Sequence, residues 1–484
     1  MKLLDFSKID SSQAKYLQLA NCIRHAIKTG QLLPNDKLPS VKSISTDTRL
    51  NRHTVMKALG ELVAEGWLIG LERVGYRVVE NLPIEHSTIA DSKNIQAVAI
   101  EYKFVRQGTA LPEKSASEYA YNFSGGLPDI SQFPFHEYKR AMSDVLTRPD
   151  LSQYTYGDSA GSPELVHQLK EYLRQTRSIL NRDVVVTNGS QEALYIIAQL
   201  FLQAGDQVAV EALGYPPAIA AFKSAGADLV GIRLDKNGMC PLTLEAQIRF
   251  GNIKLIYLTP LHQYPTTVTL PIKHRQAIYQ LATKYKIPIV EDDYDHEFHY
   301  RCQPLAPLAA DDPAQLVIYL SSFSKIMFPG ARIGVMAVNK RLATAIAEYR
   351  LMISHKSNVL MQASLAKWMS SGGFERHLRR TTRQNLQKRD HAVELLRELN
   401  CFEFVVPDGG MALWLKLKRK SGNITSAKAL AEKALLHNIC IQHQQQFIVN
   451  PMDSSDEHIR IGFAGMSIEK FATGIHKLIA LLKR

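Results

Sequence analysis

A single lysine stands between two apolar runs in the segment SSFSKIMFPGARIGV, residues 321–335. Lys325 is flanked by Ser322 and Ser324, and Arg332 follows seven residues later. A lysine beside a buried strand is costly unless it reaches water, pairs with an acid or is chemically modified. Its amine can form an imine with an aldehyde, and pyridoxal 5'-phosphate (PLP) is the common one. The serines and the arginine would then hold the phosphate. A partly exposed lysine with a structural arginine is an equally weighted alternative.

A second segment, IVEDDYDHEF at residues 289–298, gathers acids at the end of a predicted buried strand. A carboxylate in that position can pair with a protonated pyridine nitrogen, and the nearby Tyr294 can hydrogen-bond the phenolic oxygen of the ring. The cluster could instead hold a metal, but such sites usually recruit ligands from several strands. We therefore predict no metal. A solvent-facing position for Asp293 and Asp295 is the plainer alternative.

A third segment, VVVTNGSQEALYIIA, ends a predicted strand and begins a helix at Gly189, Ser190 and Gln191. The first N–H groups of a helix and its dipole favour an anion, so this turn can seat a phosphate. Taken alone, a Gly-Ser helix start is common and carries little weight.

The elements around these residues alternate from about residue 120 onward. The predicted strands are DVVVTNG, QVAVEA, KLIYLTP, PIVEDDY, LVIYLSS and RIGVMAV, with amphipathic helices such as SQEALYIIAQLFL and RQAIYQLATKYK between several of them. This pattern predicts a mostly parallel sheet that is covered on both faces. The last two strands are joined by a segment too short for a crossover helix, so we expect them to be antiparallel.

The first 80 residues have the pattern of a different kind of domain. The segments YLQLANCIRHAIKTGQL, LPSVKSISTDTRL and NRHTVMKALGELVAEGW predict three helices, the second capped by Ser40, and a hairpin around Gly75 follows. The predicted buried stripes are Leu19, Ile23, Ala26 and Ile27 on the first helix and Val55, Ala58, Leu59, Leu62 and Val63 on the third.

Basic and hydroxyl side chains gather at the start of the third helix. Arg52, His53, Thr54 and Lys57 lie mostly off its buried stripe, which suits entry into a major groove and contact with phosphates. By charge alone, a small helical domain with a solvated basic face is the favoured alternative. The net charge of +12 permits a nucleic-acid partner without requiring one.

Length and composition set the frame for these motifs. A chain of 484 residues predicts two or three domains, and the apolar share of 45% supports a large core. The five cysteines lie far apart with no CxxC pair, which suits a reducing cytosol. We find no signal peptide and no apolar run of about 18 residues, so we expect a cytoplasmic protein without a membrane partner. Residues 81–119 are mixed in composition and predict a linker, with a short strand in AVAIEY.

Residues 10–80 resemble the GntR-type winged helix-turn-helix in the opening YLQLANCIRHAIKTGQLLPNDKLPS, in NRHTVMKALGELVAEG and in the wing GYRV. The resemblance implies that the Ser and the basic residue after LP, and the Arg-x-Thr of the recognition helix, contact DNA. The DNA-binding set that we expect is Ser40, Lys42, Arg52 and Thr54, with Lys57 from the same helix. Lys42 stands where the family usually has Arg, and lysine cannot make a bidentate contact.

Residues 120–484 resemble the fold-type I PLP-dependent aminotransferases. The segments NFSGGLPDISQFP, YTYGDSAGSPEL, QAGDQVAVEALGYPPAIAAFKSAGA, LTPLHQYPT and HIRIGFAG add to those above. With the GntR-type head, the whole chain is similar to the MocR-type transcriptional regulators. The fold class implied is a winged helix-turn-helix over residues 1–80, mostly α with a β-wing, followed by an α/β domain with a mostly parallel sheet. A small C-terminal α+β subdomain is expected over about 370–484.

The resemblance gives each candidate residue a role. Lys325 becomes the Schiff-base lysine, Asp292 the partner of the pyridinium and Tyr294 the ligand of the ring oxygen. The implied phosphate cup consists of Gly189, Ser190, Gln191, Ser322, Ser324 and Arg332. Tyr215 in LGYPP would stack on the ring, and Arg460 would bind the carboxylate of an amino-acid ligand. A core aromatic and a structural arginine remain the alternatives for these last two residues.

The loop HQYPTT departs from the family pattern. Thr267 stands where the family usually has Gly, and enzymes carry an Asn near Tyr264. A missing Gly stiffens a loop beside the cofactor. The hydrogen bond from Asn to the ring oxygen would come from His262 or Gln263. These departures weigh against efficient transamination more than against PLP binding.

The expected function is that of a PLP-binding, DNA-binding transcriptional regulator. Its aminotransferase-like domain would sense PLP or an amino compound through an aldimine on Lys325. The expected partners are a double-stranded DNA operator, the small effector and a second copy in a homodimer. An active PLP-dependent aminotransferase of an amino acid, with an accessory DNA-binding domain, is the alternative. A PLP-independent scaffold is disfavoured by the presence of Lys325, Asp292 and Arg332.

Overall fold

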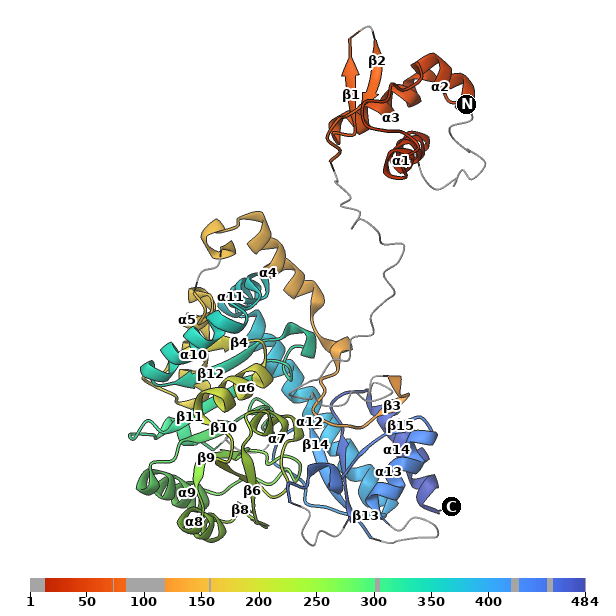
Figure 1. Ribbon diagram of the computed structural model, residues 1–484. Helices are drawn as coiled ribbons and strands as arrows, with labels where there is room; N and C mark the ends of the chain where they lie inside the picture. The colour runs from red at the N-terminus through yellow and green to blue at the C-terminus, as the bar shows by residue number, and fades with distance from the viewer. Residues whose placement is uncertain are drawn as a thin grey trace. The chain divides into compact units, whose positions relative to one another are not determined.

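The computed structural model forms two compact units, one within residues 1–104 and one within residues 105–484 (Figure 1). It describes residues 14–72, 74–83, 118–155, 158–300, 305–418, 426–450 and 456–483. Most of the predicted linker, including the segment AVAIEY, lies outside these residues. Each unit is therefore described by itself.

The first unit is a three-helix core with a hairpin, as far as the structure describes it. Its elements are α1 (Lys15–Lys28), α2 (Val41–Thr48), α3 (Arg52–Ala64) and the antiparallel strands β1 (Leu68–Leu71) and β2 (Gly75–Val78). The Ser40 hydroxyl accepts a hydrogen bond from Ser43 N at 3.2 Å, which confirms the predicted N-cap of α2. Asn51 caps α3 in the same way through Thr54 N at 2.7 Å.

The predicted stripes of this unit are buried, with one correction. The confirmed residues are Leu19, Ile23, Ala26 and Ile27 on α1 and Val55, Ala58, Leu59 and Leu62 on α3. Val63 is 38% exposed, so its predicted burial is wrong. It lies about 100° around the helix from Leu62, outside the face that meets the core.

The second unit is built on a seven-stranded sheet within the described residues. The strand order is β4 (Asp183–Thr187), β12 (Gly334–Val338), β11 (Val317–Ser322), β10 (Ile289–Asp292), β9 (Ile253–Leu258), β5 (Gln207–Glu211) and β6 (Asp228–Ile232). Strand β12 is antiparallel to both neighbours, and the other pairs are parallel. Both sheet predictions are thus confirmed. Edge strand β6 was not predicted, because only one of its five residues is buried.

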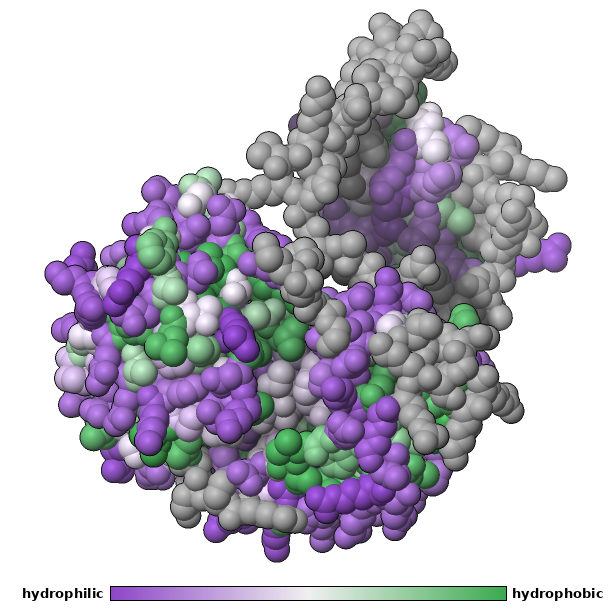
Figure 2. Space-filling model, turned by 90° about the horizontal axis from the view of Figure 1, so that it is seen from below, coloured by the Kyte–Doolittle hydropathy of each residue, from purple (hydrophilic) through white to green (hydrophobic). Residues whose placement is uncertain are grey.

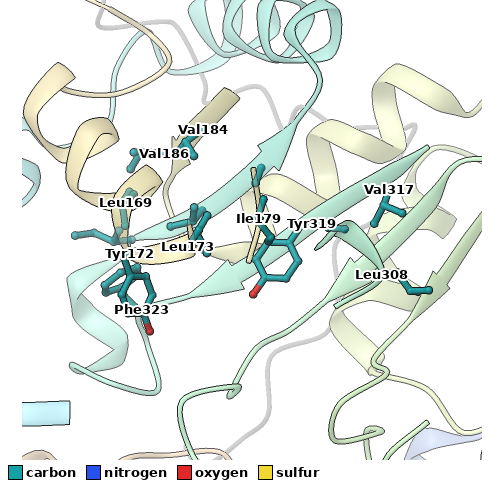
Figure 3. Packing of buried hydrophobic residues seen from close by; sticks show 14 of the residues in the cluster. Leu169, Tyr172, Leu173, Ile179, Val184, Val186, Leu308, Val317, Tyr319 and Phe323 are labelled. Atoms are coloured by element: carbon teal, nitrogen blue, oxygen red, sulfur yellow. The ribbon is translucent and has the colours of Figure 1, made fainter. Parts of the chain in front are cut away.

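Helices cover both faces of this sheet because successive strand residues point to opposite sides. One cluster packs α5, α8, α9 and α11 against Val184 and Val186, and Figure 3 shows part of it, with Tyr172 of α5 near the sheet. The other packs α6, α7 and α10 against Val185 and Met336. The helices are α4 (Phe135–Thr147), α5 (Pro163–Arg177), α6 (Ser190–Phe201), α7 (Pro216–Ser224), α8 (Pro241–Phe250), α9 (Ile272–Tyr285), α10 (Lys340–Ile353) and α11 (Val359–Ser370).

The C-terminal part of this unit forms a smaller subdomain with its own core. Its elements are α12 (Gly373–Leu399), β13 (Phe402–Glu403), β14 (Ala412–Leu417), α13 (Ala427–Leu436), β15 (Ile439–Cys440), β16 (Gln442–His443), β17 (His458–Gly462) and α14 (Ile468–Lys483). Strand β15 pairs in parallel with β3 (Tyr121–Asn122), and Phe123 enters the subdomain core. The pairing adds the segment after the predicted linker to the subdomain expected over about 370–484.

Short elements complete the description. They are β7 (Leu234–Asp235), β8 (Gly238–Met239) and the 3₁₀ turns η3 (Ile130–Gln132), η4 (Leu151–Tyr154), η5 (Leu308–Ala310), η6 (Pro329–Ala331) and η7 (Gln444–Phe447). Figure 2 shows a face of the second unit on which hydrophilic residues predominate and apolar residues gather in separate patches. None of the described helices is long and apolar enough to span a membrane. Across the same residues, no three His, Cys, Asp or Glu side chains are grouped to hold a metal ion.

Candidate functional sites

A cavity of about 540 Å³ opens at the carboxyl ends of β10 and β11. Side chains from segments far apart in the sequence meet there. The predicted cofactor-binding residues that line it are Ser190, Gln191, Tyr215, Asp292, Tyr294, Ser322, Ser324, Lys325 and Arg332. Gly189 lies directly behind this lining, at the start of α6.

Lys325 follows β11 and lines the cavity with its amine. Burial lowers the pKa of Lys325 to about 8, and the nearby positive charge of Arg460 adds to the effect while Asp295 and Asp292 oppose it. A Cβ on Gly126 would lie 3.3 Å from Nζ, so this glycine leaves the space beside the amine open. With this pKa roughly a tenth of the amine is neutral at pH 7, far more than for an ordinary lysine, and this fraction gives Lys325 nucleophilic character.

Asp292 ends β10 and is 3% exposed. Its Oδ2 accepts a hydrogen bond from Tyr257 Oη at 2.9 Å, whereas Oδ1 has no hydrogen-bond partner among the described residues. Burial raises the pKa of Asp292 to about 7, the negative charge of Asp293 also raises it, and the Tyr257 hydrogen bond lowers it. An unsatisfied buried carboxylate oxygen at the wall of a cavity fits a cationic N–H donor on a ligand.

The start of α6 and Arg332 form an anion-binding corner. Gly189 caps α6 at a φ of 84°, and the N–H groups of the first helical turn have no partners within the helix. Arg332 Nη2 donates to Asn188 O at 2.6 Å, and a Cβ on Gly189 would lie 2.7 Å from the same nitrogen. Glycine is therefore required for Arg332 to approach the helix start. Ser322 Oγ accepts from Ser324 N at 3.3 Å beside it.

Arg460 lies on β17 and is 1% exposed. Its guanidinium carbon lies 4.4 Å from the centroid of the Tyr264 ring, a cation–π contact. Nη1 donates to Ser124 O at 3.2 Å, and a Cβ on Gly125 would collide with it. Arg460 thus lies behind Tyr264, Ser124 and Gly125, which line the cavity themselves. Tyr215 also lines the cavity and meets the Tyr264 ring edge-on, with centroids 5.0 Å apart.

Two acids near the cavity are buried, so the solvent-facing alternative for them is wrong. Asp293 pairs with Arg177 at 2.6 Å and accepts from Tyr319 Oη at 2.8 Å. Burial is the largest single effect and would raise the pKa of Asp293. The charges of Arg177 and His296 and the hydrogen bonds from Tyr319 and Arg177 together lower this pKa below its ordinary value. Asp295 Oδ1 lies 2.7 Å from His262 Nδ1. These partners are far away in the sequence, and no local pattern indicates them.

The polar side chains at the start of the loop of residues 262–267 bond to other groups of the protein. The ring of His262 pairs with Asp295, and Gln263 Nε2 donates to Leu213 O and Tyr264 O. Neither side chain lines the cavity, so the expectation that one of them replaces the family Asn is not supported. Thr267 adopts a left-handed conformation with a φ of 64°, the backbone geometry for which the family uses glycine. Tyr294 Oη donates to His262 O at 2.9 Å.

Sequence reasoning missed several residues of the cavity. Tyr257 on β9 supports Asp292, and Gln442 on β16 reaches the wall from the small subdomain. The run Ser124–Gly126 also lines the cavity, but the sequence analysis used it only as part of a segment that supports the family resemblance. Its two adjacent glycines have φ of 78° and 69°, a backbone geometry that favours glycine. That glycine pair was the signal available in the sequence.

In the first unit, α2 and α3 form a helix-turn-helix, with Arg49 between them at a φ of 57°. Lys42, Arg52 and Lys57 are exposed, whereas Thr54 is half-buried and the Ser40 hydroxyl is used in the cap. Lys57 Nζ lies 4.0 Å from the centroid of the Tyr16 ring on α1. The basic start of α3 therefore faces solvent.

Two protein-family models match this chain. The family described as “Bacterial regulatory proteins, gntR family” matches residues 15–78, and “Aminotransferase class I and II” matches residues 122–478. The chain is 29% identical over 474 residues to the “Probable rhizopine catabolism regulatory protein MocR” of Rhizobium meliloti, covering 97% of this chain and 94% of that protein. It is 26% identical over 396 residues to the “HTH-type pyridoxine biosynthesis transcriptional regulator PdxR” of Corynebacterium glutamicum, covering 81% of each.

Solved structures resemble the second unit. The kynurenine aminotransferase of Pyrococcus horikoshii, solved in complex with PMP, has a TM-score of 0.69 and 28% identity, covering 75% of this chain and 90% of that one. The alpha-aminoadipate aminotransferase LysN of Thermus thermophilus, complexed with N-(5'-phosphopyridoxyl)-L-leucine, has a TM-score of 0.68 and 25% identity, covering 76% and 95%.

Proposed function

The chain belongs to the aminotransferase class I and II family and carries a GntR-family helix-turn-helix region, and from this premise we propose that it is a PLP-binding transcriptional regulator. One observation carries the proposal. A cavity with the groups that PLP requires and a helix-turn-helix with an exposed basic helix start occur in the same chain. An aminotransferase has no need of a recognition helix. The match to a regulator over 97% of this chain supports the same interpretation.

We assign PLP to the cavity because its unpaired groups match the functional groups of PLP. When bound, PLP supplies an aldehyde that reacts with primary amines and a ring that withdraws electrons. Lys325 presents the amine, and Asp292 Oδ1 presents an acceptor for the ring nitrogen. The proposed phosphate site consists of Gly189, Ser190, Gln191, Ser322, Ser324 and Arg332. Tyr215 and Tyr294 are proposed to flank the ring.

The effector that we propose is PLP itself or a small amino compound. Arg460 offers a buried positive charge for a carboxylate, and the pKa of Lys325 lies near neutrality, so this amine can exchange a proton there. Aminotransferase activity is the second candidate, because an aromatic-amino-acid aminotransferase of Thermococcus litoralis is 29% identical over 397 residues. Steady-state turnover with a panel of amino and keto acids tests it. If this protein turns over its substrates rapidly and binds no DNA, aminotransferase activity would be its favoured function.

DNA is the proposed partner of the first unit, through Ser40, Lys42, Arg52, Thr54 and Lys57.

We also propose a homodimer in the cytoplasm, whose two recognition helices read two half-sites of an operator. Exposed apolar side chains on α4 and η4, Leu146 at 55% and Leu151 at 73%, support a further contact surface on the second unit. The proposed domains are residues 1–80 and 120–484, joined by residues 81–119.

The proposal predicts two separable losses. Purified protein that carries PLP should be yellow. Borohydride reduction should leave the pyridoxyl group of PLP covalently attached to Lys325 as a label. Arg52→Ala should weaken binding to DNA duplexes that the full-length protein selects from a random pool. The loss should be about tenfold, because a base contact contributes roughly 1–3 kcal/mol. The substitution should leave the yellow colour unchanged, and wild-type binding should fall steeply with salt.

Absorbance spectra, mass mapping of the reduced label and fluorescence titrations of DNA check these outcomes. Lys325→Ala is the converse variant and should lose the label while still binding DNA. If Lys325→Ala retained the label, Lys325 would not be the lysine to which PLP attaches. An unchanged DNA affinity in Arg52→Ala, together with a flat salt dependence, would remove the DNA-binding function.

A further inference from the structure

The solvent-facing side of α3 carries apolar surface in the midst of its basic residues. Met56 is 55% exposed although it sits in the second turn of a helix whose other side is fully buried. Gly60 follows one turn later and is also exposed. Residues four apart share a helix face, so Met56 and Gly60 form one continuous strip, named here the apolar facet.

Nothing in the described part of the first unit explains the apolar facet. Glycine is the least favourable residue in a helix interior after proline. A Cβ on Gly60 would meet no atom within 4 Å, so no packing contact demands its absence. Met56 takes no part in the core that Val55, Ala58 and Leu59 form. An exposed methionine and an unneeded glycine on the same face indicate a surface that another molecule approaches closely.

The charges around the apolar facet indicate what that molecule is. Arg52 and His53 lie one turn before Met56, and both are exposed. Lys57 adjoins Met56 with its ammonium over the Tyr16 ring. Cationic groups that border an apolar strip match a DNA major groove, where phosphates line the edges and the thymine 5-methyl group is the apolar feature of the floor. An apolar protein surface would not call for this cationic border.

We propose that the apolar facet packs against the 5-methyl group of thymine in the operator, so that Met56 determines part of the sequence specificity. The Met56 thioether chain is unbranched and can adapt to the position of the methyl group. The absence of a side chain at Gly60 lets the groove edge come close to α3. This inference rests on the proposed DNA-binding function and adds the class of base that the helix reads.

Replacement of thymine by deoxyuridine tests the proposal, because it removes only the methyl group. The probes are duplexes selected from a random pool by the full-length protein, with each thymine replaced singly. At one or two positions wild-type affinity should fall about fourfold, the value expected for burial of one methyl group. Met56→Ala should bind the thymine and uracil duplexes equally, and Met56→Leu should restore part of the difference.

Control variants separate base reading from other effects. Val63→Ala removes an exposed apolar side chain on the same face of α3 but two turns further from the helix start. It should leave the thymine-to-uracil ratio unchanged, because only the start of α3 is proposed to enter the groove. Met56→Ala should keep the wild-type salt dependence because it removes no charge. Gly60→Ala should raise the thermal stability of the first unit and yet weaken binding to the selected duplexes.

The outcomes distinguish this inference from the function on which it rests. A thymine-to-uracil ratio of one at every position in the wild type would overturn the inference and leave DNA binding intact. Retention of the wild-type ratio in Met56→Ala would overturn it as well. Failure of the full-length protein to select any duplex would overturn the proposed function, and the inference with it.

Discussion

Lys325 and Asp292 line the same cavity, and burial is the main cause of both pKa shifts. The pKa of Lys325 falls to about 8 and that of Asp292 rises to about 7, because both charged forms lose water. The two groups therefore change protonation state close to neutral pH. Asp292 can lose its proton and pair with a positive charge on a ligand. Lys325 can present a neutral amine without a separate base.

Attachment of PLP to the apo protein should accelerate between pH 7 and pH 9. With the pKa of Lys325 at about 8, the neutral fraction of its amine rises about tenfold over that range. Stopped-flow absorbance with excess PLP measures the rate. The side-chain amine of Nα-acetyl-lysine provides the reference, because its reaction should keep accelerating toward pH 10. A rate independent of pH between 7 and 9 would contradict the lowered pKa.

The stability of the apo protein should depend on pH through Asp292. Its folded pKa is raised to about 7, so the folded chain holds this proton more tightly than the unfolded chain does. The resulting stabilisation is complete below about pH 4 and is lost as the pH rises through about 7. Burial also raises the pKa values of Glu211 and Glu291 to about 7, so these two groups change the stability in the same direction.

Asp292→Asn isolates this contribution because the amide does not titrate. Between pH 5 and pH 7 the wild type should lose roughly 2 kcal/mol more unfolding free energy than the variant. Urea titrations of both apo proteins at the two pH values measure the difference. Parallel pH profiles would show that Asp292 ionises at its ordinary pKa.

The start of α6 illustrates how one element serves the site. The helix offers its first N–H groups, and the glycine before it allows Arg332 to approach them. Strand β10 contributes by alternation, since Asp292 lines the cavity while the preceding Glu291 accepts hydrogen bonds from Leu308 N and Ala309 N at 2.8 and 3.0 Å. Neighbouring acids on one strand thus serve different faces of the sheet.

Gly189→Ala should weaken PLP binding at least tenfold by displacing the Arg332 guanidinium, because a hydrogen bond to a charged group contributes about 1.5–3 kcal/mol. Gly205→Ala is a matched control. Gly205 has a φ of 86°, close to the 84° of Gly189, but a Cβ there would meet nothing within 4 Å. Both variants place an alanine at a positive φ, and only Gly189→Ala should lose affinity in PLP titrations. Equal losses would attribute the effect to strain alone.

The whole molecule joins a DNA-binding unit to a ligand-binding unit in one chain. A ligand can alter DNA binding only if it binds two states of the protein unequally. The small subdomain supplies Gln442 to the cavity wall and Arg460 behind that wall, so a ligand that reaches both Lys325 and Arg460 would hold the two parts of the second unit together. Such bridging is the physical route by which a ligand would favour one state.

PLP alone, or PLP with an amino acid, should therefore change the affinity for the selected duplex. A coupling free energy of about 1–3 kcal/mol corresponds to roughly 5- to 150-fold. Lys325→Ala should abolish the change while DNA binding itself persists. Titrations with apo protein, PLP-loaded protein and PLP plus candidate amines, in wild type and variant, measure it. Identical curves throughout would mean that the second unit does not transmit the state of its ligand.

Local patterns in the sequence determined much of this protein. The period of apolar residues located the stripes of α1 and most of that of α3, and the strand–helix alternation predicted the sheet and its antiparallel pair. The Ser40 cap and the lysine-to-arginine spacing of the cavity were equally legible. These features depend on neighbours within about one or two helical turns or on a single strand, which is the range over which sequence periodicity acts.

Only the tertiary structure decided the partners of the buried polar groups. Asp293 meets Arg177, Asp295 meets His262, and Asp292 is held by Tyr257, all through pairings of distant segments. The parallel pairing of β3 with β15 joins residues 121–122 to residues 439–440. Whether a charged side chain is buried depends on elements that arrive from elsewhere in the chain, so no local rule could place these acids. The same is true of Gln263. The sequence left its amide free to face the cofactor, whereas in the structure the amide donates to the backbone carbonyls of Leu213 and Tyr264.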